Sequence, residues 1–167
     1  MADVTHKSKL RSSLVAVNPG NVENMKVLVN RCFPVTYKAE FYERVAHIYS
    51  DFTRFITVND VIVGGVCARV EESEDGPEST LHLLILLVFE KYRRFGLASK
   101  MLEWLFNTAR THSNLRSVTL HVQKSNEAAV QFYYRHGFEL VAEIPNYYTD
   151  IEYPDGLHLR LRLTPPK

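Results

Sequence analysis

The clearest hydrophobic pattern in the chain is a run of apolar residues over 81–88, interrupted only by His82. A run of this length is typical of a strand buried on both faces of a sheet. Apolar residues then recur at steps of three and four over 97–109, which is the spacing of a helix with one buried side. The chain is therefore expected to pass through a strand, a short turn and a helix between Leu81 and Ala109.

Weaker patterns predict the other elements. Alternation of apolar and polar residues predicts strands at 14–17, 52–58, 61–70, 117–122, 138–142 and 157–163. Helical spacing predicts helices at 22–32, at 127–136 and in a short segment whose apolar positions are Phe41, Val45 and Ile48. The resulting order of elements fits an α+β fold with a mixed, mostly antiparallel seven-stranded sheet and helices on both faces.

Short polar sequences mark where several elements end. Asn59 and Asp60 form a two-residue hairpin signal, because both residue types tolerate a positive φ. Ser125 or Asn126 can cap the last predicted helix, and Gly137 fits the left-handed position just after it.

Residues 33–37 form an unusually apolar loop. The preceding helix must stop before Pro34, because proline disfavours a helical residue ahead of it. A loop with two aromatic residues and a proline is either a packed corner or a hydrophobic lid over a site. The pattern alone favours the packed corner.

Composition limits the possible functions. The chain has 167 residues and a net charge of +1, which predicts one domain, over 13–164 after a flexible lead at 1–12, and no nucleic acid or membrane partner. Cys32 and Cys67 show no metal-ligand spacing, so no metal is expected and a reducing compartment is favoured. The polar start has no apolar core of a signal peptide, so the expected location is the cytoplasm, with the nucleus as a second possibility.

The turn between the 81–88 strand and the next helix carries the strongest chemical signal. Arg93, Arg94, Gly96 and Ala98 stand there in the spacing R-x-x-G-x-A. A small-residue turn that opens a helix leaves backbone N–H groups unpaired, and these favour an anion such as a phosphate. An ordinary strand-to-helix connection is the alternative, and the paired arginines make it less favoured.

That spacing resembles the acetyl-CoA loop of the GNAT acetyltransferase superfamily, whose pattern is Q/R-x-x-G-x-G/A, and the predicted order of elements is similar from Val15 to Leu163. Three further segments resemble the NatE-type N-terminal acetyltransferases in particular. They are F-P-V-x-Y at 33–37, L-H-V-Q at 120–123 and N-Y-Y at 146–148.

The resemblance implies a site for each substrate. Acetyl-CoA would be the cofactor, and its implied contacts are Leu86, Val88, Arg93, Arg94, Phe95, Gly96, Leu97, Ala98, Ser99, Asn126 and Tyr133. A protein N-terminus would be the acceptor, with the first residue, usually methionine, in an apolar groove. The implied groove residues are Phe33, Pro34, Val35, Tyr37, Leu84, Tyr147 and Tyr148.

The resemblance also implies catalytic roles for His121, as a general base acting through ordered water, and for Tyr133, as a proton donor to the thiolate. His82 stands where the family normally has a tyrosine. It could be a second base, share a proton with His121, or hold a water. On pattern alone His121 could be structural, but two histidines on neighbouring buried strands favour catalysis.

The chemistry of the acceptor favours an α-amine. Its reference pKa of about 7.7–8.0, against about 10.4 for lysine, suits a mild base such as histidine. Strand 81–88 has no Asp or Glu, whereas lysine-directed GNAT enzymes commonly keep a carboxylate base there. The expected activity is therefore N-terminal protein acetylation.

Two alternatives stay open. One is a small-amine or lysine acetyltransferase. The other is a scaffold subunit that binds acetyl-CoA with weak activity in a NatA-type complex at the ribosome.

Overall fold

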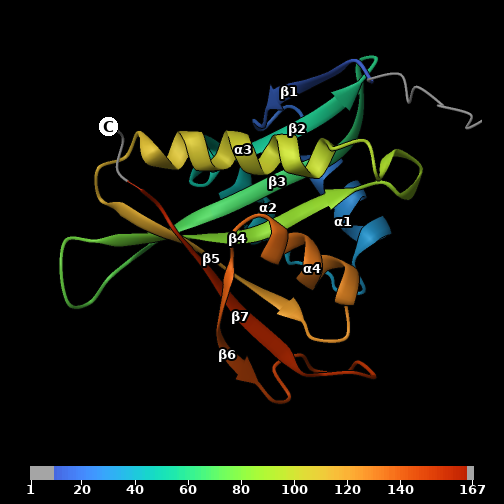
Figure 1. Ribbon diagram of the computed structural model, residues 1–167. Helices are drawn as coiled ribbons and strands as arrows, with labels where there is room; N and C mark the ends of the chain where they lie inside the picture. Colours follow the sequence, from blue (N-terminus) through green and yellow to red (C-terminus); the bar gives the residue numbers. More distant parts are fainter. Residues whose placement is uncertain (1–9, 165–167) are drawn as a thin grey trace, which may run out of the picture.

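The computed structural model describes residues 10–164 and contains one seven-stranded sheet in the order β1-β2-β3-β4-β5-β7-β6 (Figure 1). The strands are β1 Ser12–Ala16, β2 Thr53–Val58, β3 Val61–Glu72, β4 Ser79–Val88, β5 Leu115–Gln123, β6 Glu139–Ile144 and β7 Gly156–Arg162. The helices are α1 Glu23–Cys32, α2 Ala39–His47, α3 Leu97–Arg110 and α4 Glu127–Arg135. The predicted fold class and order of elements are confirmed. Most of the predicted lead, residues 1–9, lies outside the described residues.

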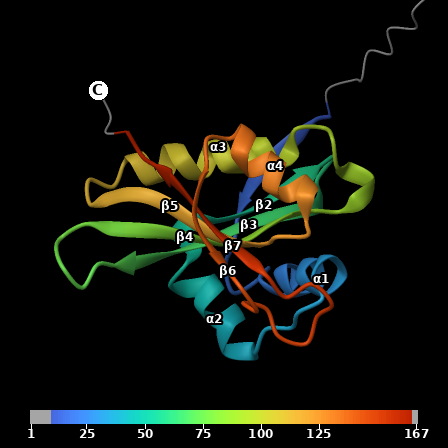
Figure 2. The same cartoon turned by 60° about the horizontal axis from the view of Figure 1, so that its bottom comes forward.

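Two layers of helices sandwich the sheet, with α3 and α4 on one face and α1 and α2 on the other (Figure 2). Each helical layer packs against the sheet and forms its own hydrophobic core. Leu97, Met101 and Leu105 of α3 are buried against one face of the sheet, as the helical spacing predicted. Met25 of α1 and Val45 of α2 are buried against the other face.

The turn signals are confirmed by the backbone. Asn59 and Asp60 have φ values of 49° and 66°, as a two-residue hairpin turn requires. Gly137 has a φ of 92° just after α4, and the Asn126 side chain accepts the Ala129 N–H at 3.3 Å, which caps the start of that helix.

The burial predicted for two segments was partly wrong. In β4 every second side chain is buried, and His82, Leu84 and Leu86 between them are only half-buried. The second predicted helix ends at His47, so Ile48 falls outside it and is 71% exposed. Tyr42 is buried on α2 instead, because the helix packs on a face shifted from the one that the spacing suggested.

A bulge in β4 explains why its buried side chains contact both helical layers. Cys67 of β3 pairs with Ile85, and the next residue Ala68 pairs with Leu83, so Leu84 has no partner in the register. The extra residue shifts the alternation, so that alternate side chains after it point to the other face of the sheet. Leu83 is buried on the α3 and α4 side, whereas Ile85 is buried on the α1 and α2 side. One short strand therefore serves both cores.

The parallel strands β4 and β5 separate halfway along their length. Their pairing ends at His82 and Thr119, although β4 continues to Val88 and β5 to Gln123. Figure 1 shows the two arrows diverging toward their ends. Backbone groups along the facing edges beyond this point have no partner strand, so the sheet opens a gap at its centre.

Candidate active site

The turn before α3 presents backbone N–H groups to open space. Gly96 caps the helix with a φ of 76°, and the first helical bond runs from the Lys100 N–H to the Gly96 carbonyl at 3.0 Å. The N–H groups of residues 97–99 therefore precede the first helical bond and have no intrahelical acceptor. A Cβ built on Gly96 would meet nothing within 4 Å. The turn thus has donors, a helix dipole and room for an anion.

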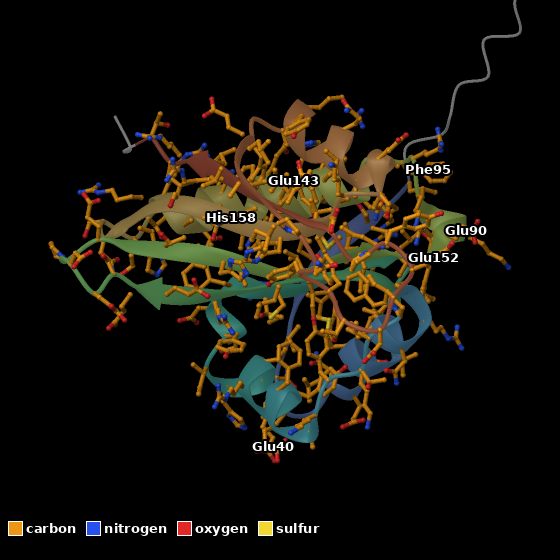
Figure 3. All side chains as sticks on the ribbon, turned by 90° about the horizontal axis from the view of Figure 1, so that it is seen from below. Glu40, Glu90, Phe95, Glu143, Glu152 and His158 are labelled. Atoms are coloured by element: carbon orange, nitrogen blue, oxygen red, sulfur yellow. The ribbon has the colours of Figure 1, made fainter. Side chains whose placement is uncertain are left out.

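The two arginines supply the matching positive charge. The Arg93 Nε–H donates to the Val88 carbonyl at 2.9 Å, which ties the turn to the end of β4. Arg94 is exposed with a φ of 66°. Figure 3 labels Phe95 at the rim of the molecule, and its side chain is 40% exposed. These features fit the diphosphate of a nucleotide coenzyme.

The remaining predicted coenzyme residues line the same side of the sheet. Leu86 is half-buried and Val88 is buried, and both pack with the core beneath α3. The Ser99 hydroxyl lies 2.9 Å from His136 Nε2, which joins the first turn of α3 to the end of α4. Asn126, at the start of α4, is exposed.

Tyr133 projects from α4 into an aromatic cluster. Its ring centroid lies 5.4 Å from those of both Phe132 and Phe138. Burial raises the pKa of the Tyr133 phenol, and the neighbouring Tyr148 raises it further. The hydroxyl therefore stays protonated at neutral pH and can act as a proton donor.

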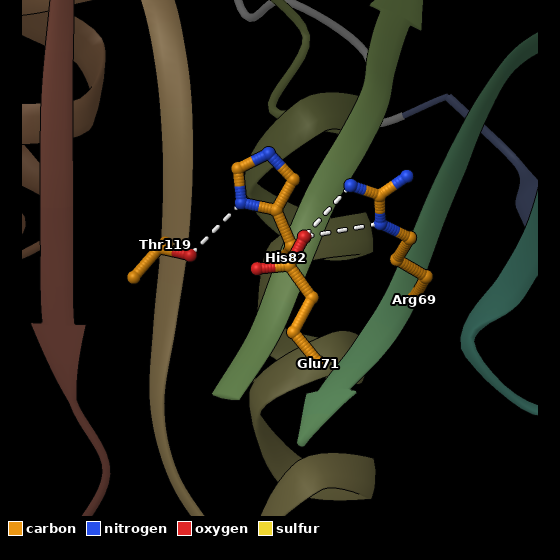
Figure 4. A network of polar contacts seen from close by, with 4 residues as sticks. All are labelled: Arg69, Glu71, His82 and Thr119. Atoms are coloured by element: carbon orange, nitrogen blue, oxygen red, sulfur yellow. Dashed lines mark hydrogen bonds and ion pairs between the residues drawn. The ribbon is translucent and has the colours of Figure 1, made fainter. Parts of the chain in front are cut away.

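The two predicted histidines meet on the opposite side of the sheet, at the point where β4 and β5 part. The ring centroids of His82 and His121 are 5.2 Å apart, which confirms that they are neighbours. His82 Nδ1 lies 2.9 Å from Thr119 Oγ1, whereas Arg69 and Glu71 form an ion pair on β3 (Figure 4). His121 Nδ1 is buried and has no hydrogen-bond partner within the described part of the chain.

Burial keeps both imidazoles neutral. Desolvation lowers the pKa of His121 to about 4, and the positive charges that His82 and His158 can carry add to the effect. Desolvation also lowers the pKa of His82, although the Glu71 carboxylate opposes it. The pKa of His121 therefore lies well below the ordinary histidine value of about 6.5. A weak base of this kind is suited to accept a proton from a nitrogen that has begun to form a bond, because that nitrogen is then more acidic.

The loop that carries Tyr147 and Tyr148 packs against His121. Tyr147 stacks on His121 with centroids 4.5 Å apart and planes 18° apart, and Tyr148 meets Tyr147 edge-on at 4.9 Å. Burial raises the pKa of Tyr148 to about 12, with Tyr147 and Tyr37 as further causes. Tyr37, from the loop after α1, is therefore close to the tyrosine pair, and the two loops face each other.

The 33–37 loop is packed at its base, as the pattern favoured. Phe33 and Tyr37 are half-buried and pack against the core beneath α1 and α2, as a packed corner would. Pro34 and Val35 are exposed, and Val35 is 41% accessible. Leu84 packs against the same core. The loop thus has a fixed base and an apolar rim that a ligand can contact.

The sequence analysis missed two residues beside the histidine pair. Thr119 is hydrogen-bonded to His82, and the ring of His158 on β7 stacks on that of His121 with centroids 4.9 Å apart. The alternation of the last strand predicted that His158 points to the opposite face from the buried leucines, but the sequence did not show which strand would lie beside it.

Among residues 10–164 no group of three His, Cys, Asp or Glu could hold a metal ion. No helix in that range is long and apolar enough to cross a membrane.

Comparison with known proteins agrees with this geometry. The profile of the Acetyltransferase (GNAT) family matches residues 22–138. The chain belongs to the GNAT family. Among curated GNAT relatives, N-alpha-acetyltransferase 50 of Danio rerio is 35% identical over 158 residues, which cover 95% of this chain and 92% of the relative. The probable N-acetyltransferase san of Drosophila melanogaster is 36% identical over 152 residues, which cover 90% of this chain and 81% of the relative.

A solved GNAT structure gives the same result. Arabidopsis thaliana Naa50 in complex with the bisubstrate analogue CoA-Ac-MVNAL superposes with a TM-score of 0.82 at 31% identity. The match covers 90% of this chain and 97% of the plant protein. The kinship with NatE-type acetyltransferases that the three shorter motifs predicted is confirmed.

Proposed function

We propose that this protein transfers an acetyl group from acetyl-CoA to the α-amine of protein N-termini, with methionine preferred as the first residue. The observation that carries the proposal is a neutral His121 at the β4–β5 gap, with an anion-binding turn on one side and two aromatic loops on the other. The names of the two curated relatives support it. So does the plant structure, whose analogue joins CoA to a peptide that begins with methionine.

The chain offers a complete set of contacts for acetyl-CoA. The turn at 93–99 would hold the diphosphate through backbone N–H groups and arginine charge. Leu86 and Val88 would contact the part of the coenzyme that carries the thioester, since they lie on the face of β4 that α3 covers. When bound, acetyl-CoA supplies an activated acyl group.

Each catalytic residue then has one task. With acetyl-CoA bound, His121 would accept, through a water, the proton that the substrate nitrogen loses as it bonds to the acyl carbon. Tyr133 would donate a proton to the sulfur that leaves as the carbon–sulfur bond breaks. His82 is held in place through Thr119, and its ring centroid lies 5.2 Å from that of His121. Because all three groups are neutral at the start, no buried charge must be created before reaction.

The groove suits an apolar, uncharged first residue. Tyr37, Val35 and Tyr147 supply aromatic and aliphatic surface without a cation to pair an acidic first residue, and burial of an unpaired carboxylate is costly. Tyr147 and Tyr148 can also hydrogen-bond the peptide backbone. A long lysine side chain would need a stronger base than His121, because its amine is the more basic one.

A peptide panel tests the proposal. The purified protein is incubated with acetyl-CoA and matched peptides that start with Met, Ser or Glu, or that carry a blocked terminus and one internal lysine. We expect the free Met terminus to be acetylated fastest. Equal or better turnover of the internal lysine would reject the proposal, and coenzyme binding without turnover of any peptide would favour the scaffold role.

We further propose that the protein works in the cytoplasm beside a NatA-type complex at the ribosome. The support is its kinship with NatE-type enzymes. Sedimentation of a cell extract tests this. We expect a ribosome-bound fraction that is lost when the NatA-type subunits are depleted, and a wholly free protein would contradict the proposal.

A further inference from the structure

A third histidine lies against the catalytic base. The rings of His158 and His121 have centroids 4.9 Å apart and planes 25° apart, so they are stacked. Tyr147 also stacks on His121, at 4.5 Å and 18°. Two aromatic rings are therefore stacked on His121, one from β7 and one from the loop after β6.

The position of His158 is set by the core. His158 pairs directly with His121 across β5 and β7, and the flanking Leu157 and Leu159 are buried on the other face of the sheet. Directly opposite residues on neighbouring strands share a face and bring their side chains together. On its second edge His158 pairs with Ala142 of β6, whose small side chain leaves the ring half-buried. Figure 3 labels His158 at the level of the sheet, between the two helical layers.

The charges around this stack come from several elements. Arg69 and Glu71 of β3 reach toward it, and His82 of β4 lies 5.2 Å from His121. Glu71 favours protonation of the imidazoles, whereas a proton on His82 or His158 opposes protonation of His121. Of these groups, His158 is the one whose ring is stacked flat on the base.

We propose that His158 is a positioning residue for His121, which keeps the imidazole plane fixed and, when it carries a proton itself, opposes a proton on its neighbour. The proposal rests on the proposed function, because it takes His121 as the base. It accounts for a half-buried imidazole whose ring is stacked on the base. Stacking fixes the direction in which the unpaired Nδ1 of His121 points.

A proton titration of His121 tests the charge effect without any turnover. The ring signals of His121 are followed by NMR in the parent and in two full-length variants. His158→Gln removes the imidazole and should raise the pKa of His121 by about half a unit, whereas His158→Arg keeps a positive charge at this position and should not raise it. His47→Gln, an exposed histidine at the end of α2, is the control and should change nothing. A His121 titration that is unchanged in the Gln variant, or that rises equally in both variants, would overturn the proposal.

The rate tests the stacking effect. His158→Phe keeps a flat ring, so kcat at pH 7.5 should stay within about twofold of the parent, whereas His158→Gln should lower kcat about five- to tenfold with little change in the KM for acetyl-CoA. Thermal melting checks that each variant is folded. Equal kcat values for the Gln variant and the parent would contradict the stacking role. If the parent itself acetylates no terminus, the proposed function fails, yet the NMR titration still decides the charge effect.

Discussion

The candidate sites on the two faces of the sheet are built in different ways. On the α3 and α4 face, the site at 93–99 is one continuous segment, and its donors are backbone N–H groups. On the α1 and α2 face, the site gathers side chains from β4, β5, β7 and two distant loops. Backbone donors recognise a diphosphate whatever the neighbouring side chains are, whereas side chains can vary and so set acceptor specificity. Substitutions on the first face should impair coenzyme binding, and those on the second should impair catalysis or choice of acceptor.

The largest expected effect is on the acceptor face. His121→Ala should lower kcat about 100-fold or more, because general base catalysis typically contributes about 10²–10⁴. Coenzyme affinity should not change, since His121 lies away from the turn. Steady-state kinetics and calorimetry with CoA separate the two quantities. His47→Ala is the control and should match the parent. A His121→Ala variant with full kcat would remove the base from the mechanism.

The next largest effect is expected on the coenzyme face. Gly96→Val places a branched side chain at a φ of 76°, where even a simple L-residue costs about 1–2 kcal/mol, and it points into the open space before α3. We expect CoA affinity to fall about 10- to 100-fold by calorimetry. Gly76→Val is the matched control, because nothing lies within 4 Å of its Cβ and its φ is not positive. Unchanged CoA binding by the Gly96 variant would show that the turn does not hold the coenzyme.

A smaller effect is expected from the apolar wall. Tyr37→Ala removes the ring that stacks on Phe41 at 4.1 Å and faces the tyrosine pair. The KM for a peptide that begins with methionine should rise about tenfold, at the scale of one buried aromatic contact, while CoA affinity stays the same. Tyr153→Ala, at a tyrosine that is 59% exposed, serves as the control. A changed CoA affinity instead of a changed peptide KM would place Tyr37 on the coenzyme side.

The smallest effect is expected at His82. Its bond to Thr119 occupies one ring nitrogen and makes it a hydrogen-bond partner more than a base. His82→Tyr keeps a polar aromatic group and should leave the rate within about tenfold of the parent or raise it, as expected when no general base is lost. His82→Phe lacks the hydroxyl and should be slower than the Tyr variant. Complete loss in both variants would make His82 an indispensable base.

The parts of the fold that sequence alone predicted are those with local causes. The positive φ of Asn59, Asp60 and Gly137 follows from residue types that tolerate it. The buried side of α3 follows from apolar residues that recur at the helical period. Ile48 was misplaced because the period does not show where a helix stops, and the stop of α2 depends on how the next segment packs.

The candidate site also has features with local causes and features that depend on tertiary packing. The sequence by itself located the R-x-x-G-x-A turn and the two histidines as candidates, since the turn depends on adjacent residues and the histidines lie on strands that their own patterns predict. Only the tertiary structure decided that β4 carries a bulge at Leu84, that β4 and β5 part after His82, and that Tyr147 and His158 stack on a His121 whose pKa is lowered by burial. The physical reason is that strand register, ring stacking and desolvation depend on residues far apart in the chain, which no local pattern brings together.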